Sequence, residues 1–264
     1  MEKLKPLKRF GQNYLKDPNI ISKIVEEISP GEDDNIIEIG PGQGSMTRKL
    51  AEKTNKLIAV EIDKRVIDDL SAEFPTTQFV RGDFLEIDLK KFFSPEGRKL
   101  RIVGNIPYNL TSPIIFKMIN NCGIISDSVL MVQYEVARRI SAKRGTKDYG
   151  ILAVLAQYFA DVKFCFKVSP NVFHPKPKVF SAVIHFFFKE NTLSEEETDI
   201  FIKIVKASFG NRRKTLKNSL SNSIFRDVNF SGSGIDLGLR AEQLEITDFL
   251  RLAEFARKEI RVSG

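Results

Sequence analysis

The sequence predicts an α/β protein with a Rossmann-like, mostly parallel sheet of seven strands, followed by a small all-helical domain. Three observations support this prediction. Short apolar runs alternate with amphipathic helical stretches over the first 150 residues. A glycine-rich turn, Gly40-Pro41-Gly42-Gln43-Gly44, directly follows the first predicted strand. From Ser194 onward, the apolar residues recur mainly with helical spacing.

The amino-terminal elements alternate as a doubly wound sheet requires. Asp17 and Pro18 form an N-cap followed by a proline in the first turn, so a helix should run from there to Pro30. Strands are predicted at 35–39, 56–61, 78–81, 100–104 and 128–133, with helices such as 64–74 between them. This spacing implies right-handed crossovers between parallel strands.

The pattern changes after Gly150. A buried helix is predicted at 151–159, followed by strands at 162–168 and 179–188 that would form an antiparallel pair and complete the seven-stranded sheet. The proline-rich segment 169–178 between them should be extended. A capping box at Ser194 opens a helix that reaches Phe209, and a basic helix at 212–220 and a last helix at 247–260 follow. We therefore expect a catalytic domain at 1–189 and a helical domain at 190–264.

Composition limits the class of protein. The hydrophobic content of 42% allows a sizeable core, and no apolar run approaches the roughly 18 residues that span a bilayer. The lysine-rich start is not followed by an apolar segment, which argues against a secretory signal. Cys122 and Cys165 cannot build a disulfide framework, and only two histidines accompany them. We expect a cytoplasmic protein with neither a structural metal nor a membrane partner.

The net charge of +7 is concentrated in three segments. Residues 1–16, 138–147 and 206–217 carry +4, +5 and +5, which leaves −7 on the rest of the chain. One such segment alone would usually be a solvated basic face, but three together favour a nucleic-acid partner. The candidate RNA-binding residues are Arg138, Arg139, Lys143, Arg144, Lys147, Arg212, Arg213, Lys214 and Lys217.

Polar residues follow successive predicted strands at the edge where ligands bind in open parallel sheets. Glycines in the 40–44 turn allow close approach of a ligand, Glu61 can bridge two ribose hydroxyls, and Asp83 can accept a hydrogen bond from an adenine amino group. A dinucleotide-binding signature would instead need Gly or Ala at Ser45 or Thr47. The glycines alone would also fit an ordinary tight turn, but the two acidic residues favour a nucleoside-bearing cofactor.

The tetrapeptide Asn105-Ile106-Pro107-Tyr108 follows the fourth predicted strand. The Asn105 side-chain carbonyl and the Ile106 backbone carbonyl could accept both protons of an exocyclic amine, with Pro107 stiffening the turn. Tyr108 could stack on the base. Combined with the glycine turn, this predicts methyl transfer from S-adenosylmethionine to an exocyclic base nitrogen. Phe173 is a second stacking candidate, although its segment could equally be a rigid connector.

Motifs along almost the whole chain resemble the KsgA-type ribosomal RNA adenine dimethyltransferase family. The matching segments are Lys8–Leu15, Glu38–Gly44, Val60–Asp63, Gly82-Asp83 and Asn105–Asn109. The resemblance implies S-adenosylmethionine as cofactor, S-adenosylhomocysteine as product and no metal. The implied and candidate cofactor-binding residues are Gln12, Asn13, Leu15, Gly40, Gly42, Gly44, Glu61, Ile62, Asp83, Phe84 and Asn105.

The resemblance also implies the substrate: two adjacent adenosines in the last small-subunit hairpin loop, dimethylated by a monomer on a late 30S assembly intermediate. Erm methyltransferases of large-subunit RNA are the nearest alternative, but Ser208–Leu216 and Arg240–Leu244 look KsgA-type. An assembly factor that acts mainly by binding is a second alternative. A DNA adenine methyltransferase is a third, although no long insertion that could read a duplex is evident.

Overall fold

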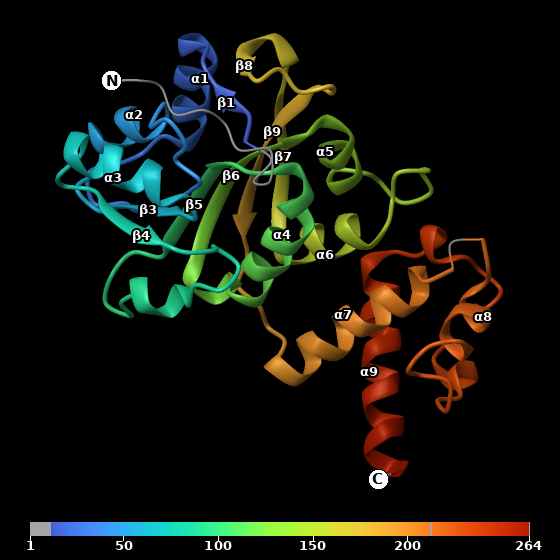
Figure 1. The fold of residues 1–264 in the computed structure, drawn as a ribbon. Coiled ribbons are helices and arrows are strands. Elements are labelled where there is room, and N and C mark those ends of the chain that lie inside the picture. Colours follow the sequence, from blue (N-terminus) through green and yellow to red (C-terminus); the bar gives the residue numbers. More distant parts are fainter. Residues whose placement is uncertain (1–11, 212, 264) are drawn as a thin grey trace. The chain divides into compact units, whose positions relative to one another are not determined.

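The computed structural model describes residues 12–211 and 213–263, and its main sheet has the predicted architecture (Figure 1). Seven strands lie in the order β4-β3-β2-β5-β6-β9-β7. The first five of these are parallel, whereas β9 runs antiparallel to both β6 and β7. The strands are β2 (Asn35–Ile39), β3 (Leu57–Glu61), β4 (Gln78–Arg81), β5 (Leu100–Asn105), β6 (Ile125–Gln133), β7 (Ala160–Val168) and β9 (Ser181–Phe188).

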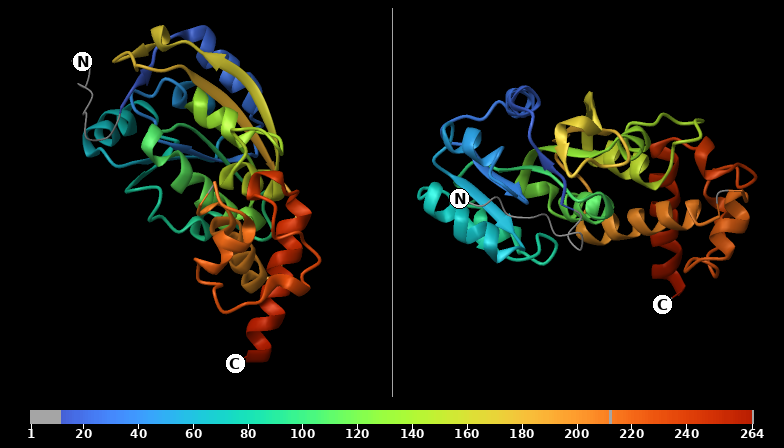
Figure 2. Two further views of the ribbon diagram at one scale, coloured as in Figure 1. Left: turned by 90° about the vertical axis from the view of Figure 1, so that its right-hand side faces the viewer. Right: turned by 45° about the horizontal axis from the view of Figure 1, so that its top comes forward.

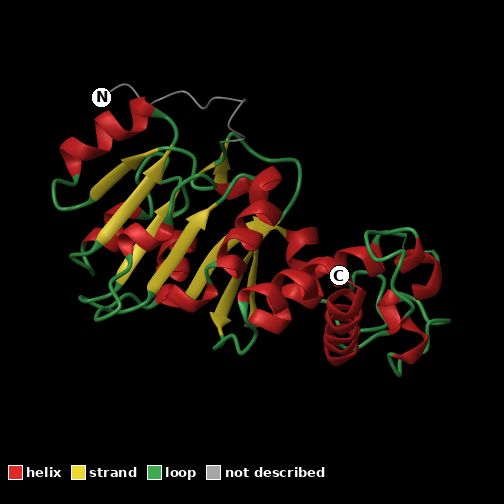
Figure 3. Cartoon of the chain, turned by 90° about the horizontal axis from the view of Figure 1, so that it is seen from below, coloured by secondary structure: helices red, strands yellow, loops and turns green. Residues whose placement is uncertain are grey.

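Helices flank both faces of this sheet (Figure 3). The first begins as predicted, because the Asp17 side chain accepts the backbone N–H groups of Asn19 and Ile20. None of the helices in the described ranges is long and apolar enough to cross a membrane. The helices are α1 (Pro18–Ile28), α2 (Thr47–Ala51), α3 (Lys64–Glu73), α4 (Thr111–Asn120), α5 (Tyr134–Ile140), α6 (Ile151–Phe159), α7 (Glu195–Phe209), α8 (Leu216–Ser221) and α9 (Ile246–Ser263).

The core on one face of the sheet packs α1 against the central strands. Ile24 and Ile28 of α1 join Ile36 of β2 and Val129 of β6 in one buried cluster. The near-continuous apolar runs of β2 and β3 fit central strands that are covered on both sides. Burial of this kind fixes the strand ends, and therefore the residues that follow them.

A second, two-stranded sheet was not predicted. Strand β1 (Tyr14–Leu15) pairs antiparallel with β8 (Phe173–His174), and Leu15 lies opposite Phe173. The segment 169–178 is therefore not simply extended: it forms a 3-10 turn at Pro170–Val172 and then this short strand. The long β7–β9 pair, visible in Figure 2, begins its second strand at Ser181, two residues later than predicted. The pairing ties the amino-terminal segment to the chain before β9.

The chain divides into two compact units. One contains the chain up to Ala137 together with Ala160–Lys189, and the other contains Arg138–Phe159 and the chain from Glu190 onward. The structure thus places 138–159 with the carboxyl-terminal helices, where the sequence had assigned it to the catalytic domain. The physical reason is aromatic packing: the Tyr158 ring of α6 lies 4.8 Å, centroid to centroid, from the Phe201 ring of α7.

Helix α8 begins at Leu216, so the predicted basic helix at 212–220 was wrong in its start. The backbone N–H groups of Leu216 and Lys217 bond to the carbonyls of Leu239 and Leu237, which fixes where the helix starts. Arg213 and Lys214 lie in the turn before it, and Arg212 lies outside the described residues.

Candidate active site

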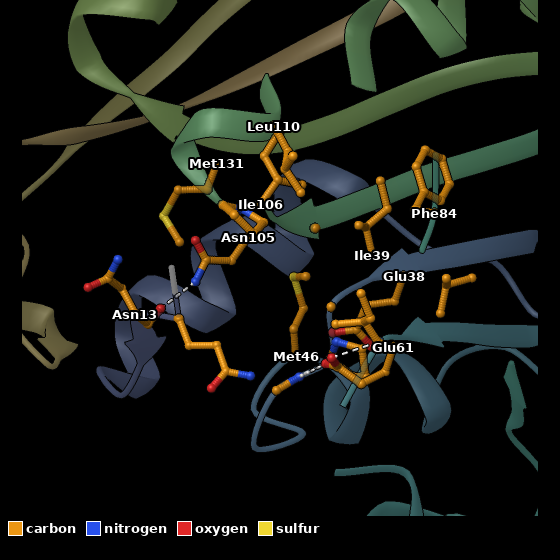
Figure 4. A pocket seen from close by; sticks show the side chains of 18 of the residues that line it. Asn13, Glu38, Ile39, Met46, Glu61, Phe84, Asn105, Ile106, Leu110 and Met131 are labelled. Atoms are coloured by element: carbon orange, nitrogen blue, oxygen red, sulfur yellow. Dashed lines mark hydrogen bonds between the residues drawn. The ribbon is translucent and has the colours of Figure 1, made fainter. Parts of the chain in front are cut away.

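A cavity of about 270 Å³ lies at the carboxyl ends of the parallel strands (Figure 4). This volume is near the lower end of the range for small-molecule sites, roughly 300–1,000 Å³. Its walls come from β1, the glycine-rich turn after β2, the ends of β3, β4 and β5, and the start of α4. Predicted residues that line it are Gln12, Asn13, Leu15, Gly40, Gly42, Glu61, Ile62, Asp83, Phe84, Asn105, Ile106, Pro107 and Tyr108.

The glycine-rich turn forms one wall. Gly40 has φ +64°, and a Cβ atom built there would meet no other atom within 4 Å, so the backbone is open to a ligand. Gly42 has φ +55°, and its Cβ would lie 2.9 Å from the Tyr14 ring. Gly44, also predicted to bind the cofactor, does not line the cavity; it packs against Leu70 of α3. Its role is therefore in the turn and in helix packing.

Glu61 is held rigidly at the end of β3. Its Oε1 accepts the backbone N–H groups of Ile62 at 2.9 Å and Asp63 at 3.0 Å, and its Oε2 accepts a long 3.4 Å bond from the Gly42 N–H. Burial raises its pKa, while these three backbone donors lower it. The weakly bonded Oε2 faces a cavity that a ribose diol would fit.

Glu38 is a cavity residue whose role the sequence prediction missed. Its side chain is 1% exposed, and Oε2 has no hydrogen-bond partner within the described part of the chain. Burial raises the pKa of Glu38 to about 7; hydrogen bonding from Thr47 opposes that rise, and the Glu61 charge adds to it. The sequence feature that could have identified Glu38 is its position at the start of the glycine motif.

The neighbouring wall is apolar, with one acid. Ile62 is 45% exposed although it lines the cavity, and Phe84 is buried on another side. Asp83 Oδ1 accepts the Leu85 N–H at 2.9 Å, which leaves Oδ2 as a further acceptor. An apolar slot with one carboxylate at its rim is suited to a flat, amino-bearing ring such as adenine.

The Asn105 side chain has a fixed orientation. Its Nδ2 donates to the backbone carbonyl of Asn13 at 2.8 Å (Figure 4). Only the amide nitrogen can donate to a carbonyl, so this bond decides which way the amide faces. Oδ1 is consequently on the other side, where it can accept a hydrogen bond from a ligand.

The residues after Asn105 are placed by β6 and β9. Ile106 is buried, with its N–H directed at the Met131 carbonyl at 3.3 Å, and Pro107 begins the turn into α4. The Tyr108 hydroxyl lies 2.8 Å from Ser181 Oγ. Burial raises the pKa of Tyr108, so the phenol stays neutral.

Phe173, the second stacking candidate, does not line the cavity. Its ring is 5% exposed and belongs to the apolar cluster beneath β1 and α1. Backbone pairing opposite Leu15 directs it there. Phe173 supports the strand that forms the cavity wall, and two-residue strands give no periodic signal from which this could be read.

The basic candidates lie in the second unit and are exposed wherever they are described. Arg138 pairs with Asp148, and Arg144 Nη1 lies 3.0 Å from Glu245 Oε1. Backbone hydrogen bonds join each basic segment to residues 237–242. The Gly145 N–H donates to the Glu242 carbonyl, and the Lys217 N–H donates to the Leu237 carbonyl. The structure thus collects 143–147 and 213–217 at the two ends of one short segment. The remaining described basic candidates are Arg139, Lys143, Lys147, Arg213 and Lys214.

The model of the family described as "Ribosomal RNA adenine dimethylase" matches residues 3–258. The chain belongs to this family. A relative from Chlorobium phaeobacteroides (strain BS1), named ribosomal RNA small subunit methyltransferase A, is 46% identical over 245 residues, covering 93% of this chain and 91% of its own. A relative of the same name from Francisella tularensis subsp. novicida (strain U112) is 40% identical over 257 residues, covering 96% and 98%.

Solved structures of adenine methyltransferases have the same fold. A dimethyladenosine transferase from Plasmodium falciparum is 27% identical with a TM-score of 0.77, covering 93% of this chain and 98% of its own. The 23S rRNA methyltransferase ErmE is 27% identical with a TM-score of 0.65, covering 93% and 100%. Family membership makes the chain an S-adenosylmethionine-dependent rRNA adenine dimethyltransferase, as the sequence predicted.

Proposed function

We propose that the chain dimethylates the N6 amines of two adjacent adenosines in the 3′-terminal hairpin loop of small-subunit ribosomal RNA, on a late 30S assembly intermediate. The relatives at 40–46% identity carry small-subunit names, which supports this substrate over large-subunit RNA. We further propose that the protein acts as a cytoplasmic monomer, because its substrate is assembled there and the cavity is complete within one chain.

The observation that carries the proposal is the Asn105–Asn13 hydrogen bond. An adenine amine is a poor nucleophile because its lone pair is delocalised into the ring. The fixed Asn105 Oδ1 and the Ile106 carbonyl accept hydrogen bonds from its two N–H groups, favour a tetrahedral nitrogen and aim the lone pair into the cavity. This is stabilisation by preorganised acceptors, with little reorganisation during reaction.

The cavity residues fit S-adenosylmethionine, which supplies an electrophilic methyl group when bound. Glu61 Oε2 would hold the ribose hydroxyls, and Asp83 Oδ2 with Ile62 and Phe84 would hold the adenine. The open backbone at Gly40 would lie against the amino-acid end. Glu38 Oε2 is buried and has no hydrogen-bond partner among the described residues, so the cavity interior holds a polar atom that a ligand could satisfy.

Tyr108 would stack on the target base. Its hydroxyl is anchored on Ser181 Oγ, so the ring is held at both ends, by the backbone turn and by β9. A neutral phenol in this position cannot act as a strong base. Its contribution is alignment of the base and exclusion of water.

The experiment that tests these roles compares Asn105→Ala and Tyr108→Ala with the wild-type protein. Both variants should lose at least 100-fold in methylation rate, about 2.7 kcal/mol of barrier. Tyr108→Ala should bind S-adenosylmethionine normally in calorimetry. Wild-type turnover by either variant would refute its assigned role, and Tyr108→Phe, which keeps the ring, is the matched control.

A second experiment tests the substrate. The protein is incubated with methyl-labelled S-adenosylmethionine and either unmethylated small-subunit particles or mature large-subunit RNA. Label should enter two adjacent adenosines of the small-subunit hairpin, up to two methyl groups on each. Label confined to large-subunit RNA would replace the proposal with an Erm-like function.

A further inference from the structure

An exposed aromatic cluster lies where β7 ends and β9 begins. Phe164 is 38% exposed, Val179 43% and Phe180 45%. Single exposed apolar residues are ordinary, but adjacent ones usually mark a binding surface. Tyr134, at the start of α5, joins them, because its ring centroid lies 6.1 Å from that of Phe164 in an edge-to-face arrangement.

Lys167 holds the rings of this cluster together. Its Nζ lies 3.9 Å from the Phe180 ring centroid and 4.5 Å from that of Tyr134. The backbone is equally well fixed, since the Tyr134 N–H bonds to the Phe180 carbonyl at 2.9 Å and continues the β6–β9 ladder. We refer to Tyr134, Phe164, Lys167 and Phe180 as the aromatic–lysine cluster.

The charge around the cluster is positive. Lys176 and Lys178 are exposed in the segment that leads to Phe180, and Lys167 lies within the cluster. The acidic residue next to it in sequence is the exposed Glu135. With three lysines and one glutamate, this surface is better suited to bind a polyanion than to bind an apolar protein surface that carries few acidic residues.

The cluster adjoins the target-base site. Phe180 directly precedes Ser181, whose Oγ lies 2.8 Å from the Tyr108 hydroxyl. Consecutive residues at a strand end point to opposite faces, so the side chains of Phe180 and Ser181 lie on opposite faces of the sheet at the start of β9. Their backbones are only one residue apart, so an RNA strand that leaves the Tyr108 site over this strand end would pass next to Phe180.

We propose that the aromatic–lysine cluster is a stacking platform for an unpaired nucleobase of the substrate RNA next to the target adenosine. Exposed rings offer π faces that accept any base, and lysines neutralise the flanking phosphates. The proposal rests on the proposed function, because it assumes that RNA occupies the Tyr108 site. It adds a second base-binding position outside the cavity.

The test uses unmethylated small-subunit particles whose RNA carries 2-aminopurine in turn at each position flanking the target adenosines. Wild-type protein should change the fluorescence at one of these positions, and Phe180→Ala and Tyr134→Ala should abolish that change. The KM for RNA should rise at least fivefold in both variants. Affinity for S-adenosylmethionine should stay unchanged, which shows that the fold is intact.

Phe187→Ala is the matched control, because Phe187 is 43% exposed and lies on the same strand at its far end. Phe180→Tyr should restore binding, whereas Phe180→Leu, which keeps the bulk without the ring, should not. Wild-type RNA binding and a wild-type fluorescence change in Phe180→Ala would overturn the proposal. It would also be overturned if Phe180→Ala bound RNA normally and lost only its binding to a ribosomal protein. If the wild-type protein does not methylate unmethylated small-subunit particles, the proposed function fails instead, and the two failures are distinguishable.

Discussion

At the residue scale, two acidic side chains of the cavity influence each other's ionisation. Glu38 and Glu61 are both buried, and the charge of Glu61 raises the pKa of Glu38 further above its ordinary value. Glu61 has three backbone donors, whereas Glu38 Oε2 has no partner among the described residues. Glu38, which has fewer hydrogen-bond donors to stabilise its charge, is therefore the one that keeps its proton near neutral pH.

This predicts a pH dependence of stability that belongs to Glu38. The unfolded side chain ionises near pH 4.5, but the folded one does so at about 7. Between these values the folded state binds more protons, so stability falls as pH rises, by up to about 3 kcal/mol in total. Below pH 4.5 both states are protonated and the loss is absent.

Glu38→Gln should remove this loss, because the amide does not titrate. In urea denaturation from pH 5 to 8, the free energy of unfolding of the variant should gain on that of the wild type as pH rises. Any cost of burying the amide shifts the variant equally at every pH and leaves this trend unchanged. Parallel curves for the two proteins would contradict the prediction.

At the element scale, the glycine-rich turn and strand β1 constrain each other. Gly42 combines a left-handed backbone with a position 2.9 Å from the Tyr14 ring, measured from its would-be Cβ. Tyr14 is in turn fixed by its hydroxyl bond to Gln12 Oε1 at 2.8 Å and by pairing of β1 with β8. The turn therefore accepts no side chain without moving the strand that forms the opposite wall.

Gly42→Ala should weaken S-adenosylmethionine binding about tenfold or more, since an alanine in this conformation costs roughly 1–2 kcal/mol before any clash. Isothermal calorimetry measures the affinity, and circular dichroism checks the fold. Gly123→Ala is the control, because a Cβ there would meet nothing within 4 Å. Equal affinities of the two variants would show that the turn is not in contact with the cofactor.

Periodicity and capping predicted the longer elements, and they failed where structure depends on distant pairing. The bounds of β2 and β4 and of α6 agree with the prediction. The β1–β8 pair joins residues about 160 positions apart through two residues each, which leaves no local pattern. The late start of α8 has the same origin, because bonds from residues 216 and 217 to 239 and 237 set it.

The site shows the same division. Residues at strand ends, such as Glu61 and Asn105, were predicted because topology alone brings strand ends together. Two contacts that hold the site were not predicted, the bond from Asn105 to the Asn13 carbonyl and that between Tyr108 and Ser181 Oγ, since neither pairing carries a sequence signature. For Phe173 the sequence left a stacking role and a rigid connector open, and it did not indicate the strand pairing that buries the ring.

At the scale of the whole molecule, the cavity belongs to one unit and the paired basic segments to the other. Cofactor binding and RNA affinity should therefore be separable by mutation. The exposed residues Arg213 and Lys214 lie beside the segment that also anchors 143–147, so they are the sharpest test of phosphate contact.

Replacing Arg213 and Lys214 together by Gln should weaken RNA binding and reduce the slope of log K against log salt concentration by roughly 1.5. The affinity for S-adenosylmethionine should not change. The control replaces Lys203 and Lys258 by Gln, which removes the same charge from residues paired within their own helices. An unaltered slope in the first variant would leave these residues as a solvated basic face.

The amide at position 105 also restricts how this enzyme can diverge. Its nitrogen donates to the Asn13 carbonyl at 2.8 Å, and an aspartate there would set a carboxylate oxygen against a carbonyl oxygen. During evolution, aspartate could replace Asn105 only if the segment with Asn13 and β1 moved away from position 105 at the same time. The exchange of a single NH₂ group for oxygen is therefore coupled, across 92 positions of sequence, to the position of the cavity wall at Asn13.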